Sequence, residues 1–158
     1  MFANYGLTAL AAQALEKSLL LLIAAIECLE TGQTERDALY DVFGRHNRKP
    51  LGRLIAVLRE KVTLPQDLES DLGQALGERN HVMHNFFLNG FEVSDLERSV
   101  EKMSEELRPI RDHLNAVSSR IDAMVGVVQE RFEVTREKLD RQARQLLENY
   151  QASVEKKQ

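Results

Sequence analysis

Apolar side chains recur at steps of three and four along almost the whole chain, and sustained alternation of apolar and polar residues is nearly absent. This spacing is typical of amphipathic helices and argues against strands. We expect helices over residues 7–30, over a short stretch that ends at Phe43, and over residues 51–61 and 65–88. The second half of the first helix is apolar nearly all round, which predicts burial on several sides.

A very long final helix is predicted to begin near Ser94, which has the spacing of a capping box with Glu97. Thr63 and Gln66 have the same spacing before the preceding helix. Large apolar residues of the final helix alternate steps of four and three, which is a heptad seam. The seam comprises Leu96, Val100, Met103, Leu107, Ile110, Leu114, Val117, Ile121, Met124 and Val128.

The seam continues with shifted spacing to Tyr150, as a stutter would produce. Pro109 lies outside the seam and is expected to kink the helix near Glu105. Part of the seam can fold back on its own chain. We therefore expect its C-terminal half to be the intermolecular part of a homodimer.

These patterns predict an all-α fold, a helical bundle with a long C-terminal helix that carries the heptad seam. We expect one domain overall. Residues 1–92 would form the bundle, and residues 93–158 would form the long helix, which packs on the bundle and extends as a coiled coil.

Composition narrows the class of protein. The 158 residues are 43% hydrophobic and 29% charged, with a net charge of −4, so no global basic field favours nucleic acid. Cys28 is the single cysteine, which excludes a disulfide framework or a cysteine-based zinc site within one chain. The uncharged run 19–26 is about half of a membrane span, and no basic segment precedes it. The sequence favours a cytoplasmic protein without a membrane segment or a cofactor.

The most informative string is E-R-N-H-V-M-H-N-F-F, which contains Arg79, Asn80 and His84. In an unbroken helix, Arg79 and His84 would diverge by about 140°. Arg79 would face the apolar stripe, where an arginine needs a carboxylate partner, and Glu16 and Glu27 are the candidates. A purely structural interpretation stays open, in which Arg79 is a paired core residue and His84 a packing residue.

An arginine followed by a polar residue, with a histidine five positions on, resembles the signature of HEPN-domain ribonucleases. The resemblance covers roughly residues 5–125 and leaves the C-terminal extension unexplained. It implies a helical bundle, mostly dimeric, with the motif helix bordering the dimer cleft. It also implies metal-independent RNA cleavage, in which the ribose 2′-hydroxyl attacks the adjacent phosphate and Arg79, Asn80 and His84 are catalytic. Toxin-type relatives bind an antitoxin or another protein partner.

Other residues are candidates for lesser roles. His81 can act as a second acid or base, or contact RNA, and the segment with Arg45, His46, Arg48 and Lys49 can bind phosphates. His81 and His84 lack a convincing further metal ligand beyond Glu78, so we expect no metal site. Arg108 and His113 repeat the motif spacing by chance.

The main alternative to an enzyme is a non-enzymatic helical dimer. It would act as an interaction or scaffold protein through its C-terminal helix, and the motif would be structural. Proximity of Arg79 and His84 at an accessible surface separates the two hypotheses.

Overall fold

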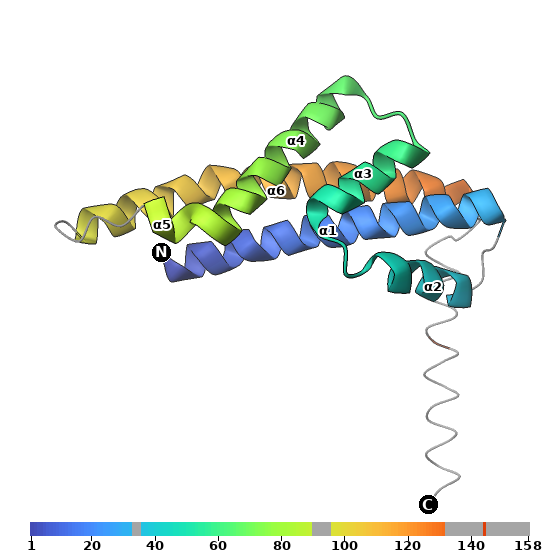
Figure 1. Cartoon of the computed structure of the whole chain (residues 1–158), viewed down its shortest axis with the longest axis horizontal. Coiled ribbons are helices and arrows are strands. Elements are labelled where there is room, and N and C mark those ends of the chain that lie inside the picture. The colour runs from blue at the N-terminus through green and yellow to red at the C-terminus, as the bar shows by residue number, and fades with distance from the viewer. Residues whose placement is uncertain (33–35, 90–95, 132–143, 145–158) are drawn as a thin grey trace, which may run out of the picture.

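The computed structural model describes residues 1–32, 36–89, 96–131 and residue 144. The described residues form helices and connecting segments without strands, so the predicted all-α fold is confirmed (Figure 1). The elements in chain order are α1 (Phe2–Thr31), α2 (Arg36–His46), α3 (Leu51–Lys61), α4 (Gln66–Asn80), a π-helical turn (His81–Asn85), α5 (Phe86–Asn89) and α6 (Leu96–Arg131).

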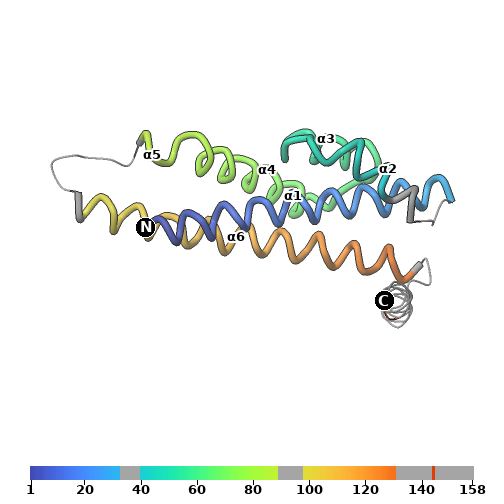
Figure 2. Tube along the Cα trace, turned by 90° about the horizontal axis from the view of Figure 1, so that it is seen from below, coloured from blue at the N-terminus to red at the C-terminus, as the bar shows by residue number. Residues whose placement is uncertain are grey.

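Two long helices, α1 and α6, run parallel and side by side (Figures 1 and 2). Their polar contacts keep a nearly constant offset along the chain. Asn4 Nδ2 donates to Ser104 Oγ at 2.6 Å, and further along the pair the hydroxyls of Ser18 and Ser118 lie 2.9 Å apart. Both pairs are separated by 100 residues, so the two helices hold one register along this stretch.

The heptad seam of α6 is the face that packs on the bundle. Its buried members are Met103, Leu107, Leu114, Val117 and Ile121. Ile110, Met124 and Val128 are partly buried against the same core. Over the described residues the seam is therefore intramolecular. The expected intermolecular half, after residue 131, lies outside the described residues.

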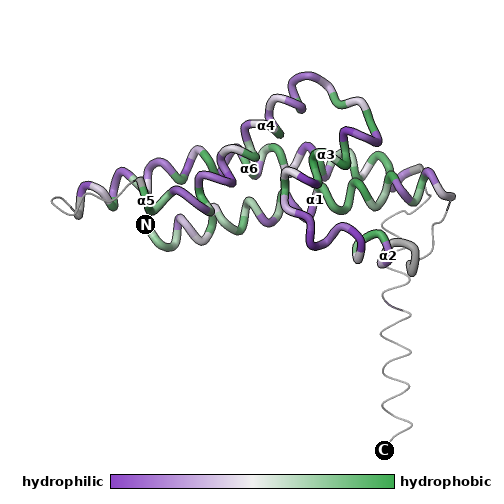
Figure 3. The backbone as a smooth tube through the Cα atoms, in the orientation of Figure 1, coloured by the Kyte–Doolittle hydropathy of each residue, from purple (hydrophilic) through white to green (hydrophobic). Residues whose placement is uncertain are grey.

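The helices α2 and α3 pack on α1, whereas α4 and the π-turn lie against α6. Arg120 of α6 bonds to Asp67 and Asp71 of α4, and His113 bonds to Glu78. The α1 residues Leu15, Leu19, Leu22 and Ile23 are almost fully buried. Figure 3 shows α1 as apolar over most of its length, which matches this burial. An apolar helix of this kind needs cover on several sides, as the sequence predicted.

The helix ends agree with the sequence in some places and differ in others. The first helix ends before Gly32, whose φ of 67° is the left-handed conformation that glycine adopts without strain. The third helix has the predicted bounds. The predicted capping box of Thr63 is wrong, because Pro65 occupies the N-cap position of α4 and no side chain caps that helix.

Pro109 lies inside α6, so the helix continues through it. The predicted capping box at Ser94 lies outside the described residues. The single helix predicted over residues 65–88 is interrupted by the π-turn, which starts one residue after Asn80. This interruption decides the geometry of the motif.

By length and composition, α1 could cross a membrane, and it is the one described helix that meets this test. The core helix of a soluble protein passes the same test. More than half of its most apolar window, 56%, is buried inside the structure. This burial gives α1 a packing role within the bundle.

The buried pair of Ser18 and Ser118 tests the register of α1 against α6. Ser18→Ala should lower the free energy of unfolding by about 1 kcal/mol, because it leaves the Ser118 hydroxyl buried without its partner. The double variant with Ser118→Ala should recover most of this loss, since both polar groups are then absent. Urea unfolding of wild type, of Ser18→Ala and Ser118→Ala alone, and of the double variant measures the coupling between the two residues. Strictly additive losses would contradict the contact.

Candidate functional site

The motif lies where the helix that begins as α4 widens into the π-turn. The backbone N–H of Phe86 donates to the carbonyl of His81, a bond that spans five residues instead of four. A π-turn turns through a smaller angle per residue than an α-helix. Because the turn occupies part of the segment between Arg79 and His84, the two side chains diverge by less than in an unbroken α-helix.

The predicted divergence of about 140° is therefore wrong, because it assumed an unbroken α-helix. Arg79 Nη1 lies 3.5 Å from His84 Nε2 and donates to Asn80 Oδ1 at 3.2 Å. The three motif residues thus form one cluster within a single chain. Asn80 and His84 are exposed, and Arg79 is partly buried.

Helix α1 holds this cluster in place through a carboxylate. Arg79 Nε donates to Glu16 Oε1 at 3.2 Å, across 63 residues of sequence. Of the two carboxylates considered for Arg79, Glu16 is the partner, while Glu27 binds elsewhere. The pair fixes one edge of the guanidinium and leaves Nη1 directed toward Asn80 and His84.

The contact between Arg79 and His84 places an imidazole beside a guanidinium, with 3.5 Å between the two nitrogens. Histidine is the side chain that most often transfers protons in enzymes, and a guanidinium can bind a phosphate.

The other histidines near the motif are paired with carboxylates of neighbouring helices. His81 Nε2 lies 2.9 Å from Glu106 Oε1, and its ring meets Phe86 edge-on. His113, the histidine of the chance repeat, lies 2.6 Å from Glu78 Oε2 through Nδ1. Among the described residues there is no group of three potential metal ligands.

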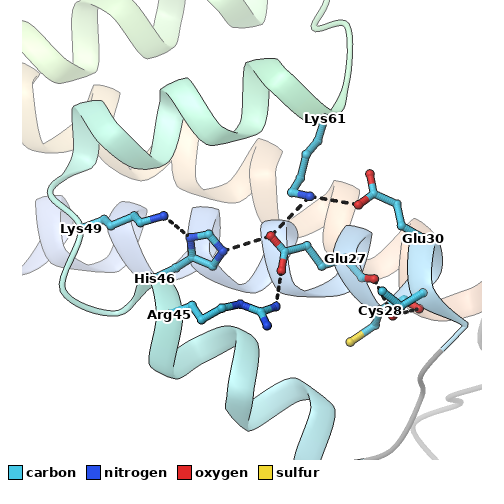
Figure 4. A network of polar contacts seen from close by, with 8 residues as sticks. Glu27, Cys28, Glu30, Arg45, His46, Lys49 and Lys61 are labelled. Atoms are coloured by element: carbon cyan, nitrogen blue, oxygen red, sulfur yellow. Dashed lines mark hydrogen bonds and ion pairs between the residues drawn. The ribbon is translucent and has the colours of Figure 1, made fainter.

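The basic segment that was expected to bind phosphate is partly neutralised inside the fold (Figure 4). Arg45 donates to Glu27 at 2.7 Å, and the buried His46 bridges Glu27 Oε1 and the ammonium group of Lys49. Lys61 also lies 3.3 Å from Glu27. These contacts make Arg45, His46 and Lys49 parts of a structural network.

Two other cations of this region face solvent. Arg48 and Arg53 are exposed, and in the part of the chain that the structure describes neither has an ion-pair partner. Arg53 was not predicted. The available signal was charge, because residues 42–59 contain no Asp or Glu in a chain of net charge −4.

The network around Glu27 shifts the protonation of two groups. Burial raises the pKa of Glu27, but hydrogen bonds from Arg45, His46 and Lys61 outweigh burial and hold it below its ordinary value. Burial likewise lowers the pKa of Lys61, and its bonds to Glu30 and Glu27 outweigh this and raise it. Both shifts favour the charged pair.

Glu27→Gln should lower the free energy of unfolding by about 1–3 kcal/mol, because it removes a charged acceptor shared by three donors. The matched control is Glu30→Gln, whose side chain is 50% exposed against 14% for Glu27, and it should cost under about 0.5 kcal/mol. A carboxyl group whose pKa is lowered by folding stabilises the fold at pH values above its unfolded pKa of about 4.3. This stabilisation is lost as the pH falls through the folded pKa. Denaturation at pH 7 and pH 3 should show the gap between wild type and Glu27→Gln narrowing in acid, and a gap that widened would contradict the network.

No protein-family model, no curated protein and no solved structure matches the chain. Function must therefore be argued from the cluster of Arg79, Asn80 and His84 and from its surroundings.

Proposed function

We propose that this protein is a HEPN-like RNA-binding protein and metal-independent endoribonuclease. One observation carries the proposal. The π-turn gathers Arg79, Asn80 and His84 into a single accessible cluster, and Glu16 anchors it from α1. A motif with a purely structural role would not require an exposed histidine beside a guanidinium. By resemblance, the protein acts as a toxin-type or defence ribonuclease in the cytoplasm.

The residue types suit cleavage through the ribose 2′-hydroxyl. The imidazole of His84 removes the hydroxyl proton, and the 2′-oxygen attacks the adjacent phosphorus. Arg79 stabilises the negative charge that develops on the phosphate oxygens, and Asn80 orients one of them. The bond to the 5′-oxygen breaks, which yields a 2′,3′-cyclic phosphate. The leaving oxygen receives its proton from the second protomer of a dimer.

Cations outside the motif support binding of the strand on either side of the cleaved bond. Lys17 follows Glu16 on α1, and its ammonium group donates to Asn47, next to Arg48. Arg53 lies in the first turn of α3, next to Gly52, and Gly52 lies against Leu76 of α4, one turn before Asn80. Arg48, Arg53 and Lys17 therefore replace Arg45 and Lys49 as the proposed phosphate contacts, and His81 is assigned a structural role.

A homodimer is part of the proposal, but its interface differs from the one expected on the C-terminal seam. An outward row on α1 consists of Leu7, Leu10, Ala14 and Leu21, at steps of three, four and seven, and the exposed Lys17 occupies the heptad position between Ala14 and Leu21. Exposed leucines at heptad spacing are typical of a helix that pairs with another helix. Pairing along this row would bring a second copy beside Glu16.

The same row favours the second candidate function, a non-enzymatic interaction protein. In that case the row would recruit a different protein, such as an antitoxin, and the motif cluster would be inert. The buried, reduced Cys28 suits a cytoplasmic location under either function.

His84→Ala should reduce cleavage of RNA by at least about 10²-fold, because it removes the proton acceptor. It should change the free energy of unfolding by less than about 1 kcal/mol, since the side chain is exposed. Cleavage should persist in EDTA and leave 2′,3′-cyclic phosphate ends. Gel assays on total RNA measure the cleavage, and mass spectrometry identifies the ends of the products. Cleavage that survives His84→Ala or needs a divalent metal would refute the mechanism.

Arg79→Ala should abolish cleavage and also lower the free energy of unfolding by about 1–2 kcal/mol, because Glu16 loses its partner. Arg79→Lys should recover part of the stability and little of the activity, since an ammonium group lacks the forked donors. Arg108→Ala is the matched control, an exposed arginine of the chance repeat, and should change neither quantity. Equal effects of Arg79→Ala and Arg108→Ala on cleavage would remove Arg79 from the site.

Leu7→Glu combined with Leu10→Glu should convert the dimer to a monomer, because it places charges in the exposed row of α1. The control is Val127→Glu, an equally exposed apolar position on α6. Light scattering at micromolar concentration measures the mass. A wild-type monomer at high micromolar concentration, or a dimer that persists in the double variant, would contradict this interface.

A further inference from the structure

Four aromatic rings gather where the beginning of α1 meets α5, near the N label in Figure 1. Tyr5 lies 5.7 Å from Phe86 and 4.8 Å from Phe87, measured between ring centroids. Phe2 stacks on Phe87 at 6.3 Å with an angle of 29° between the rings. Phe86 is buried and anchors the group, while Phe87 is 37% exposed and Phe2 is 74% exposed.

The exposed pair lies close to the motif. Phe87 is the second residue after the π-turn and follows His84 by three residues, which places it within about one helical turn of the imidazole. Phe2 extends that face onto α1, and Tyr5 supports Phe87 from the side. The surface therefore has flat aromatic rings next to an imidazole and a guanidinium.

We propose that Phe2 and Phe87 form a platform that stacks an unpaired base of the RNA strand whose phosphate lies at Arg79 and His84. The inference rests on the proposed function and deepens it, because it assigns single-stranded RNA as the substrate class. Single-stranded RNA is commonly held by bases splayed onto aromatic side chains. Every base has a flat face, so such a platform accepts many sequences.

The surroundings favour a nucleotide over a protein as the occupant. A protein interface centred on Phe87 would also cover Asn80, His84 and Asn85, which are exposed and polar, and would remove them from water. A nucleotide carries a flat apolar ring and an anion one sugar apart. It can place the ring on Phe87 and the phosphate beside Arg79 and His84, so both halves of the surface are used.

Two probes separate stacking from attraction to phosphate. The first is a short 2′-O-methyl oligoadenylate, which cannot be cleaved because its 2′-oxygen carries no proton. The second is an abasic oligonucleotide of the same length, which retains the phosphates and lacks the bases. The variants are Phe2→Leu and Phe87→Leu, which keep an apolar side chain without a ring. Tyr40→Leu on α2 is the matched control, an exposed aromatic residue at 59% exposure and far from α5.

We expect wild type to bind the oligoadenylate more tightly than the abasic probe. Each variant should weaken binding of the oligoadenylate by about tenfold, the effect typical of losing one base–aromatic stack. Binding of the abasic probe should be unchanged, and Tyr40→Leu should match wild type with both probes. Equal losses on the two probes, or no loss on either, would overturn the platform.

The chain contains no tryptophan, so Phe87→Trp introduces a single fluorophore that can still stack. Its emission should be quenched by the oligoadenylate and not by the abasic probe, whereas the emission of Tyr40→Trp should respond to neither. Quenching by both probes alike would overturn the inference. The inference would also be overturned if Phe87→Leu converted a dimer to a monomer and weakened binding of both probes equally, because that outcome would mark a protein interface.

The results also separate this inference from the proposed function. Wild type that binds both probes, with variants that bind as wild type does, would refute the platform and leave RNA binding intact. Wild type that binds neither probe would refute both.

Discussion

The architecture depends on burying α1, a helix that is apolar nearly all round. Few polar side chains interrupt it, and a buried polar group must find a partner. Five of the partly or fully buried ones are bonded to other elements of the fold. The pairs are Asn4 with Ser104, Thr8 with the carbonyl of Leu107, Ser18 with Ser118, Glu16 with Arg79, and Glu27 with Arg45, His46 and Lys61. These bonds help set the positions of α2, α3, α4 and α6 along α1.

The candidate site is a product of that constraint together with one irregular turn. Glu16 fixes the guanidinium of Arg79, and the π-turn rotates His84 toward it. A π-turn has poorer hydrogen-bond geometry than an α-helix and is found frequently at functional sites. Phe87 follows the turn in α5. One irregular turn thus lies between a guanidinium and an exposed aromatic ring and carries the imidazole itself.

Much of the fold could be predicted from the sequence, because apolar spacing reports which face of a helix is buried. It identified α3 to the residue and the buried seam of α6, and it named Glu16 as a candidate partner of Arg79. The π-turn could not be predicted, since helical periodicity assumes a constant angle per residue. The neutralisation of Arg45 was equally hidden, because its partner Glu27 lies on another helix and becomes a neighbour only after folding.

The central claim is that the π-turn brings Arg79 and His84 together, and nuclear Overhauser spectroscopy of the labelled protein tests it most directly. The account predicts cross-peaks between the ring protons of His84 and the δ-methylene of Arg79. It also predicts that the amide of Phe86 is close to the α-proton of His81, five residues earlier. An amide of Phe86 that pairs with Val82 in a regular α-helix, without contacts between the two side chains, would contradict the account.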